Sequence, residues 1–181
     1  MKKTSIHAIC FVAMFAAIIC VLSLLTIPTP SGVPLTLQTF AVAFCGFVLG
    51  KKYGAVSTGV YICIGLVGVP VFAGMKSGPA VLFGPTGGYL IGFIFLSFFC
   101  GLSMSFYRKR RLLVAFFSML GLTFCHALGI AQLKLYYHMT WAAAAMAGTV
   151  PYIVKDIVSV IIAFMMAVTV RRALRAAGLL D

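Results

Sequence analysis

The chain has 181 residues, of which 63% are hydrophobic and only 9% are charged. Because soluble domains carry about 25% charged residues, this composition excludes an ordinary soluble globule and predicts a single integral membrane domain over residues 1–181. The net charge of +12 does not indicate nucleic-acid binding, since the basic residues form short clusters between apolar runs rather than one polar face.

Six apolar segments approach the roughly 20 residues that a helix needs to cross a bilayer. In chain order they cover residues 6–27, 35–50, 54–72, 88–106, 112–136 and 151–170. We therefore predict an all-α fold, a polytopic bundle of six transmembrane helices. The alanine-rich stretch Trp141–Gly148 predicts a short additional helix in the last outer loop.

The first segment follows Lys2 and Lys3 and superficially resembles a signal peptide. It is too long for a typical signal core, and no clear A-x-A cleavage site follows it, so we expect a retained helix. Ala13 and Ala17 form a small-xxx-small face on this helix, a pattern that lets helices approach closely.

Small and polar residues mark the second and third segments. Gly46, Gly50 and Gly54 repeat at four-residue spacing, which favours close helix contact. Gln38 follows Pro34 at the outer end of the second segment, where its amide could hydrogen-bond either a ligand or a neighbouring helix.

The basic residues predict the orientation of the helices, because cytoplasmic loops are enriched in Lys and Arg. Three of the 14 basic residues, Lys76, Lys134 and Lys155, lie at one set of segment ends. The opposite ends hold the others: Lys2, Lys3, Lys51, Lys52, Arg108, Lys109, Arg110, Arg111, Arg171, Arg172 and Arg175. We therefore expect both termini in the cytoplasm and the loops around residues 28–34, 70–88 and 137–150 outside.

A turn rich in Pro and Gly, residues 84–88, leads into the fourth segment at Tyr89. Gly84, Gly87 and Gly88 allow a ligand or another backbone to approach closely. Irregular backbone at membrane depth is tolerated where it is buried in protein or lines a cavity. The turn therefore predicts the wall of a binding site with Tyr89 beside it. Two alternatives stay open: the glycines serve helix packing, or Tyr89 belongs to an interfacial aromatic belt.

Asp156 is the only acidic residue before Asp181, and it lies near the outer end of the sixth segment. Carboxylates inside membrane spans are costly and indicate function by default. Pro151 suits the first turn of a helix and Thr149 could cap it, and the positive end of that helix would stabilise the carboxylate. The sequence therefore predicts that Asp156 contacts a ligand.

A structural role is the alternative for Asp156, as an ion pair with Lys134 or Lys155. Adjacent residues on a helix do not face each other, so we expect Lys155 and Asp156 to address different groups. One acceptor, one cation, one aromatic ring and exposed backbone donors in an apolar setting are typical of a small-molecule site. Lys76, in the same outer region, is expected to be solvated.

Missing patterns exclude several kinds of chemistry. The six cysteines lie in apolar segments without a C-x-x-C pair, and His7, His126 and His138 have no partner at metal-ligand spacing. We therefore expect no metal, no cofactor, and structural or interfacial histidines. The sequence has neither a G-x-x-x-x-G-K-[ST] motif nor an acidic pair, so the chain should neither hydrolyse ATP nor carry out two-carboxylate acid–base chemistry.

Several motifs occur in a characteristic order: Pro34-Leu35-Thr36-Leu37-Gln38-Thr39, Leu49-Gly50 before a basic pair, Gly68-Val69-Pro70-Val71-Phe72-Ala73-Gly74, and residues 84–93. Together they resemble the BioY family, the biotin-binding S-components of energy-coupling-factor (ECF) transporters, over nearly the whole chain. Residues 151–156 are similar to the family's proline–aromatic…aspartate signature. Many members carry Pro-Gly before the aspartate and a lysine three positions after it. In this chain Val154 and Lys155 stand in place of Pro-Gly, and Ser159 stands in place of the lysine. The departure affects the role of the lysine and not that of the aspartate.

The resemblance implies a bundle in a prokaryotic plasma membrane that holds biotin near the extracellular surface. Asp156 would accept N–H bonds from the ureido ring, and such charge-assisted bonds are strong. Lys155 would meet the tail carboxylate or orient the site. Tyr89 and the turn 84–88 would pack on the bicyclic ring, and the loops 28–34 and 70–84 are candidates for a lid.

Since the chain has no nucleotide site, the resemblance also implies partners: a transmembrane coupling subunit and two cytoplasmic ATPases. The face formed by Ala13 and Ala17 resembles the family's contact with the coupling subunit. Three other functions compete with this one. They are an S-component for a different vitamin, a proton-coupled secondary transporter that uses Asp156 and works alone, and an intramembrane enzyme.

Overall fold

The computed structural model describes residues 6–27, 33–107 and 110–179. In this part of the chain the helices are α1 (Ile6–Leu24), α2 (Gln38–Leu66), α3 (Pro79–Phe83), α4 (Gly87–Ser103), α5 (Arg111–Tyr137), α6 (Trp141–Gly148) and α7 (Ile153–Ala176). Strands β1 (Thr26–Ile27) and β2 (Leu35–Thr36) form a small antiparallel sheet that the sequence did not predict. The short helix expected at Trp141–Gly148 is confirmed as α6.

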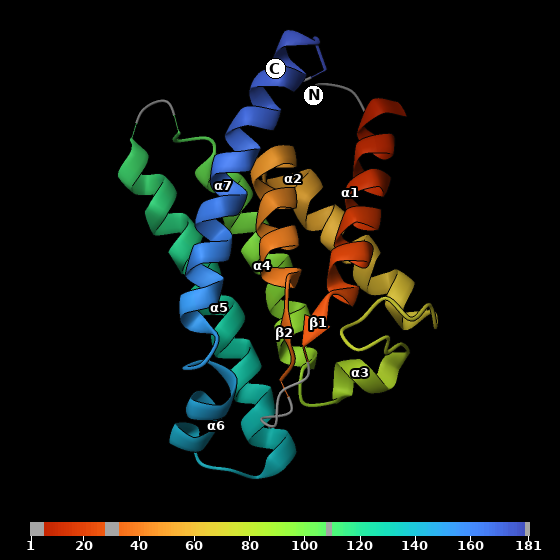
Figure 1. Cartoon of the computed structure of the whole chain (residues 1–181), viewed down its shortest axis with the longest axis vertical. Helices are drawn as coiled ribbons and strands as arrows, with labels where there is room; N and C mark the ends of the chain where they lie inside the picture. Colours follow the sequence, from red (N-terminus) through yellow and green to blue (C-terminus); the bar gives the residue numbers. More distant parts are fainter. Residues whose placement is uncertain (1–5, 28–32, 108–109, 180–181) are drawn as a thin grey trace.

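The second and third predicted segments form one element, α2, which is bent at Gly50. Gly50 has φ 81° and ψ 174°, a conformation that glycine adopts at no steric cost. The two arms, residues 38–49 and 51–66, diverge from this bend (Figure 1). They touch at the predicted glycines, because a Cβ on Gly54 would lie 2.8 Å from Gly46 Cα. The third segment is shorter than predicted, since α2 ends at Leu66.

Four described helices are long and apolar enough to cross a membrane: α1, α2, α5 and α7; α4 is a shorter apolar helix. A count of six spans therefore stays a prediction. The start of α1 and the end of α7 lie at the same end of the molecule, and α6 lies at the other (Figure 1). Four basic residues that entered the orientation argument (Lys2, Lys3, Arg108 and Lys109), together with residues 28–32 and Asp181, lie outside the described residues.

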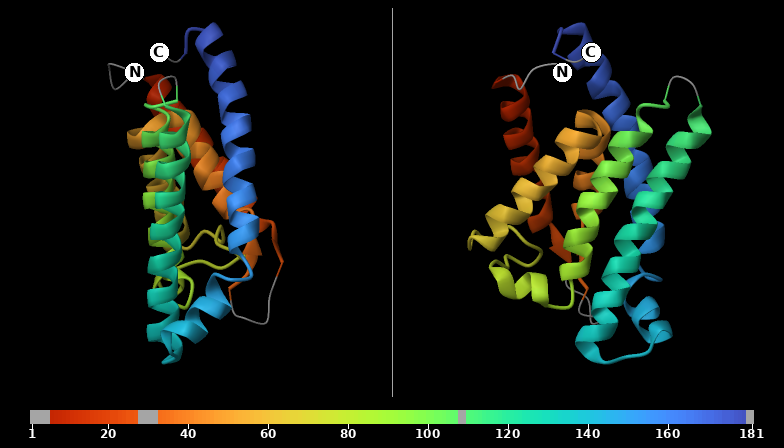
Figure 2. Two further views of the ribbon diagram at one scale, coloured as in Figure 1. Left: turned by 90° about the vertical axis from the view of Figure 1, so that its left-hand side faces the viewer. Right: turned by 180° about the vertical axis from the view of Figure 1, so that it is seen from behind.

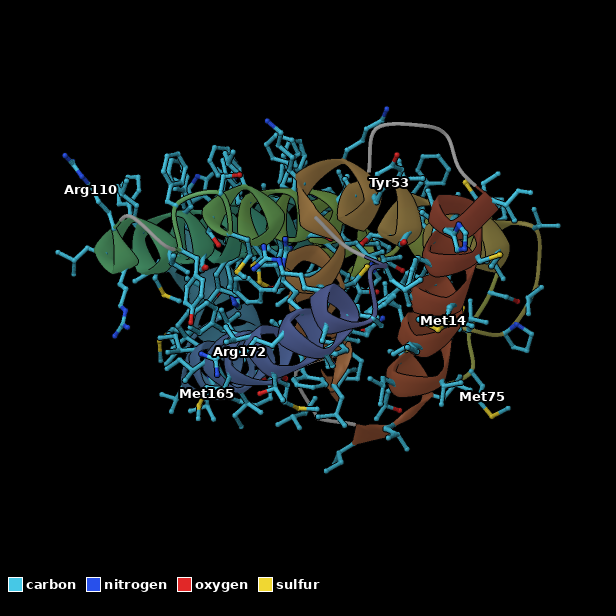
Figure 3. The ribbon with its side chains drawn as sticks, turned by 90° about the horizontal axis from the view of Figure 1, so that it is seen from above. Met14, Tyr53, Met75, Arg110, Met165 and Arg172 are labelled. Atoms are coloured by element: carbon cyan, nitrogen blue, oxygen red, sulfur yellow. The ribbon has the colours of Figure 1, made fainter. Side chains whose placement is uncertain are left out.

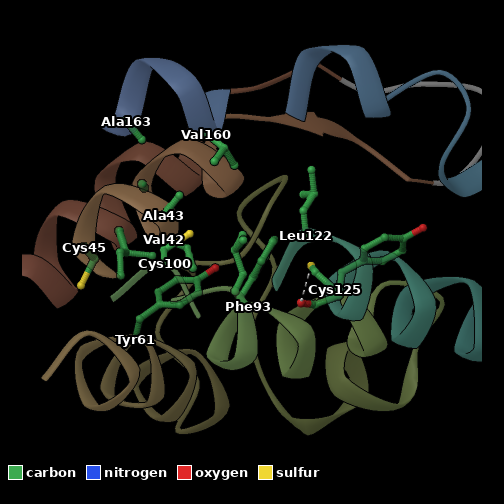
Figure 4. Close-up of a cluster of buried hydrophobic side chains, with 14 of the residues drawn as sticks. Val42, Ala43, Cys45, Tyr61, Phe93, Cys100, Leu122, Cys125, Val160 and Ala163 are labelled. Atoms are coloured by element: carbon green, nitrogen blue, oxygen red, sulfur yellow. Dashed lines mark hydrogen bonds between the residues drawn. The ribbon is translucent and has the colours of Figure 1, made fainter. Parts of the chain in front are cut away.

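The core lies between two layers of helices. Seen from the side, α4 and α5 form one layer and α7 forms part of the other (Figure 2). Buried side chains from α2, α4, α5 and α7 meet between them, among them Val42, Phe93, Leu122 and Val160 (Figure 4). Small residues bring α4 against α5: a Cβ on Gly92 would lie 2.6 Å from Cys125 Cα.

The segment between α2 and α4 is fastened to three helices. Ser23 on α1 donates a hydrogen bond to the Val71 carbonyl, and the Gly78 amide donates to the Gly65 carbonyl at 2.8 Å. On α5, Gln132 Nε2 donates to the carbonyls of Leu82 and Gly84, both at 2.7 Å. These bonds hold the segment beside the end of the bundle where α4 begins.

Candidate functional site

A cavity of about 720 Å³, its open mouth included, lies where the first arm of α2, α4 and α7 begin. This is the end of the bundle opposite the start of α1 (Figure 1). The polar part of its lining includes Thr36, Gln38, Tyr89, His126, Lys155 and Asp156. The sequence thus predicted four of these six residues, and the fold brings them together from segments more than 100 residues apart.

Asp156 is the centre of this polar cluster. It lies in the first turn of α7 and is 5% exposed. Its Oδ1 lies 2.5 Å from Lys155 Nζ, and its Oδ2 lies 3.2 Å from His126 Nε2. Burying a carboxylate without partners is costly, so these two side chains stabilise the charge while its remaining lone pairs can still accept hydrogen bonds.

Lys155 does not address a separate group, and that prediction was wrong. Its Nζ pairs with Asp156 and also donates to the Thr36 carbonyl at 2.9 Å. The rule that neighbours on a helix diverge fails here because the flexible lysine stem bends back at the helix start. Lys134, the other candidate partner, instead lies over the Trp141 ring at 4.7 Å.

The sequence analysis missed two of these six residues, Thr36 and His126, and of the two it is His126 that contacts Asp156. It is buried on α5, with Nδ1 3.1 Å from Thr149 Oγ1 and its ring edge-on to Tyr89 at 6.0 Å. The rule that singled out Asp156, an ionisable group inside an apolar helix, applies to His126 equally and would have found it.

The helix start beside the cluster also differs from the prediction. Tyr152 is the N-cap of α7 and makes no side-chain cap hydrogen bond, and Pro151 precedes the helix. Thr149 is the C-cap of α6, and its hydroxyl meets His126 instead of capping α7. The Tyr152 hydroxyl donates to the Val33 carbonyl, which ties α7 to the segment before β2.

Tyr89 and Gln38 line the cavity and are both held by protein partners. The Tyr89 hydroxyl donates to the Gly148 carbonyl at 2.7 Å, and its side chain is only 8% exposed, unlike a tyrosine of an interfacial belt. Gln38 Nε2 donates to the Tyr61 hydroxyl at 2.7 Å, and Gln38 Oε1 accepts from the Thr36 hydroxyl at 3.0 Å. Gln38 therefore contacts a neighbouring helix arm and still borders the cavity.

The glycines of the predicted turn lie elsewhere. Gly84, Gly87 and Gly88 are not among the residues that line the cavity. A Cβ on Gly88 would collide with the Leu128 carbonyl of α5, and one on Gly87 would lie 2.7 Å from Gln132 Nε2. The packing alternative fits these two positions, and their contact with a ligand has no support in this geometry.

The rest of the lining is mainly apolar, with the hydroxyls of Thr39 and Thr86 and one exposed cation. Phe72, Leu90 and Phe93 contribute to the walls, and Phe93 also belongs to the core cluster (Figure 4). Lys76 is exposed, as expected for a solvated residue, and it also borders the cavity. Among the described residues, no group of three or more His, Cys, Asp or Glu side chains could hold a metal. The arrangement suits a small molecule with N–H donors at one end, an apolar body and an anionic end.

Known proteins resemble this chain over most of its length. The biotin transporter BioY of Thermotoga maritima is 37% identical over 161 residues, which are 88% of this chain and 92% of the relative. BioY2 of Lactococcus lactis is 32% identical over 96% of this chain and 95% of its own length. A crystal structure of the S-component for biotin from an ECF-type ABC transporter superposes with a TM-score of 0.78, at 27% identity, over 97% of this chain and 94% of its own. Residues 1–176 match the BioY family profile, and the chain belongs to that family.

Proposed function

We propose that this chain is the substrate-specific S-component of an ECF transporter and captures biotin in the cavity at Asp156. The observation that carries the proposal is a buried carboxylate that lines a largely apolar cavity and is fixed by Lys155 and His126. The family membership supports the same ligand. The chain is a transporter subunit and not an enzyme.

Biotin offers groups that match the cavity from one end to the other. Its ureido N–H groups would donate to the free lone pairs of Asp156, with Lys155 and His126 orienting the carboxylate. Phe72, Leu90 and Phe93 would pack against the bicyclic ring. Lys155 is already bonded to two protein oxygens, so Lys76 at the edge of the cavity is the better partner for the tail carboxylate.

Transport would depend on partners in the membrane and the cytoplasm. We place both termini in the cytoplasm, so the cavity faces outward and the segment 70–84 is its candidate lid. Ala13 and Ala17 are exposed on α1, and we assign this face to a transmembrane coupling subunit that works with two ATPases. Small exposed residues allow the close helix contact that such an interface uses.

Ligand selectivity tests the proposal directly. The purified chain in detergent, titrated calorimetrically with biotin, thiamin and riboflavin, is expected to bind biotin alone and at one molecule per chain. Binding of another vitamin in place of biotin would agree with an S-component and would refute biotin as its ligand. Uptake by the chain alone that collapses with the proton gradient would refute the dependence on ATPases.

A further inference from the structure

A second, basic cavity lies at the opposite end of the bundle from Asp156. It encloses about 1610 Å³, open space included, between the bend of α2, the end of α4 and the last turns of α7. Figure 3 looks onto this end, with Tyr53 on α2 and Arg172 on α7, both of which line the cavity. Arg172 is one of five basic residues that line it; the others are Lys51, Lys52, Arg171 and Arg175.

The charge in this cavity has no acidic counterpart among the described residues. Asp156 is the only carboxylate side chain in that part of the chain, and it lies about 22 Å from Arg171 along α7 at 1.5 Å per residue. Arg171 Nη1 donates to the carbonyls of Phe47 and Val48 at 2.9 and 3.0 Å, where the first arm of α2 ends. Arg171 thus has a structural role, whereas Lys51, Lys52 and Arg172 are exposed at the cavity.

An apolar groove adjoins the basic cavity. It runs between α5 and α7, encloses about 1030 Å³ with its open side, and is lined by Val114, Ala115, Met119, Val160, Ile161 and Phe164. Tyr107 borders both the groove and the cavity, and its ring lies 5.6 Å from that of Phe164. Arg111, also in the groove lining, adds a cation.

We propose that these two features form one binding site for an anionic phospholipid. The phosphate would lie among Lys51, Lys52 and Arg172, and one acyl chain would fill the groove between α5 and α7. Basic pockets between membrane helices bind anionic headgroups. Each Lys or Arg near an anionic membrane surface contributes about fivefold in affinity. The continuity of a cationic cavity with an apolar groove fits a lipid better than a soluble anion. The inference rests on the membrane placement of the chain and not on biotin binding.

Native mass spectrometry of the purified chain with phosphatidylglycerol or phosphatidylcholine tests the headgroup. We expect phosphatidylglycerol to be retained preferentially, and Arg172→Gln to weaken its retention about fivefold. Arg110→Gln is the matched control, because Arg110 is an exposed arginine at the same end that does not line the cavity (Figure 3). Equal retention of the two lipids, or equal effects of the two variants, would overturn the proposal.

A second pair of variants tests the acyl chain. Ala115→Trp fills the groove from an exposed position and should lower phosphatidylglycerol retention, whereas Met165→Trp, an exposed residue of α7 outside the groove, should not. If inorganic phosphate competes fully and Ala115→Trp has no effect, the site takes a soluble anion and the lipid is excluded. If Arg172→Gln impairs only co-purification with the coupling module, the cavity belongs to a protein partner. Biotin titration of the same samples reports the proposed function separately, since none of the substituted residues lines the cavity at Asp156.

Discussion

At the scale of single residues, the central arrangement is Asp156 held between two helices. Lys155 comes from its own helix and His126 from α5, so the position of the carboxylate depends on how α5 and α7 approach each other. The imidazole is itself oriented by Thr149. His126 is therefore a positioning residue, and its removal should affect biotin affinity without abolishing it.

His126→Asn is expected to weaken biotin binding about tenfold, because the shorter amide cannot reach Asp156 and a hydrogen bond to a charged group contributes about 1.5–3 kcal/mol. His138→Asn serves as the control: His138 is exposed, and its φ of 52° is one that asparagine tolerates. Calorimetric titration measures both. Equal affinities of the two variants would show that His126 does not orient the site.

The sequence alone identified Asp156 as a candidate ligand acceptor but not the side chains that surround it. Asp156 could be predicted because a lone carboxylate in an apolar segment is costly and seldom occurs without a functional role. The contact between Lys155 and Asp156 could not be predicted, since it depends on how one flexible side chain bends at a helix start. The exclusion of Gly88 from the cavity depends on which face of α4 meets α5, and helical spacing alone does not decide that.

At the scale of elements, the glycines of α4 determine how closely it packs on α5. Gly88 and Gly92 both face the backbone of that helix, and Tyr89 lies between them in the sequence with its hydroxyl bonded to α6. The position of the Tyr89 ring at the cavity therefore depends on the glycine contacts. The repeat was visible in the sequence, whereas the joining of two predicted segments into α2 at Gly50 required the backbone geometry.

Gly88→Ala should destabilise the protein by about 1–3 kcal/mol, the cost of overpacking a tight contact, because the new methyl group meets the Leu128 carbonyl. Gly59→Ala is the matched control, since nothing lies within 4 Å of a Cβ there; it should leave stability unchanged or raise it by up to about 1 kcal/mol. Thermal unfolding in detergent compares the two. A melting temperature unchanged in Gly88→Ala would contradict the packing role.

At the scale of the whole molecule, the cavity and the face that we propose for the coupling subunit lie on different elements. The cavity lies at the end where α7 begins, whereas Ala13 and Ala17 are exposed on α1. Changes on the exposed face of α1 should therefore leave the cavity intact.

Ala13→Trp is expected to abolish co-purification with the coupling subunit and to leave biotin affinity within about twofold of wild type, because the enlarged side chain prevents close helix contact. Ala142→Trp makes the same enlargement at an exposed alanine of α6 that lines neither cavity nor the groove, and it should assemble normally. Affinity purification of the complex and calorimetry on the isolated chain give the two readouts. If Ala13→Trp loses biotin binding but assembles normally, the assignment of this face to the coupling subunit is contradicted.

The most direct test is a calorimetric titration of biotin into wild type, Asp156→Asn and Val154→Asn. Val154 lies two residues earlier on the same helix, is 70% exposed and does not line the cavity. Val154→Asn therefore introduces the same amide side chain outside the cavity. We predict one-to-one binding that Asp156→Asn weakens by about 1.5 kcal/mol or more, the scale of a hydrogen bond to a charged group, and that Val154→Asn leaves unchanged. Biotin binding of equal strength in all three proteins would contradict the assignment of Asp156 as the biotin acceptor.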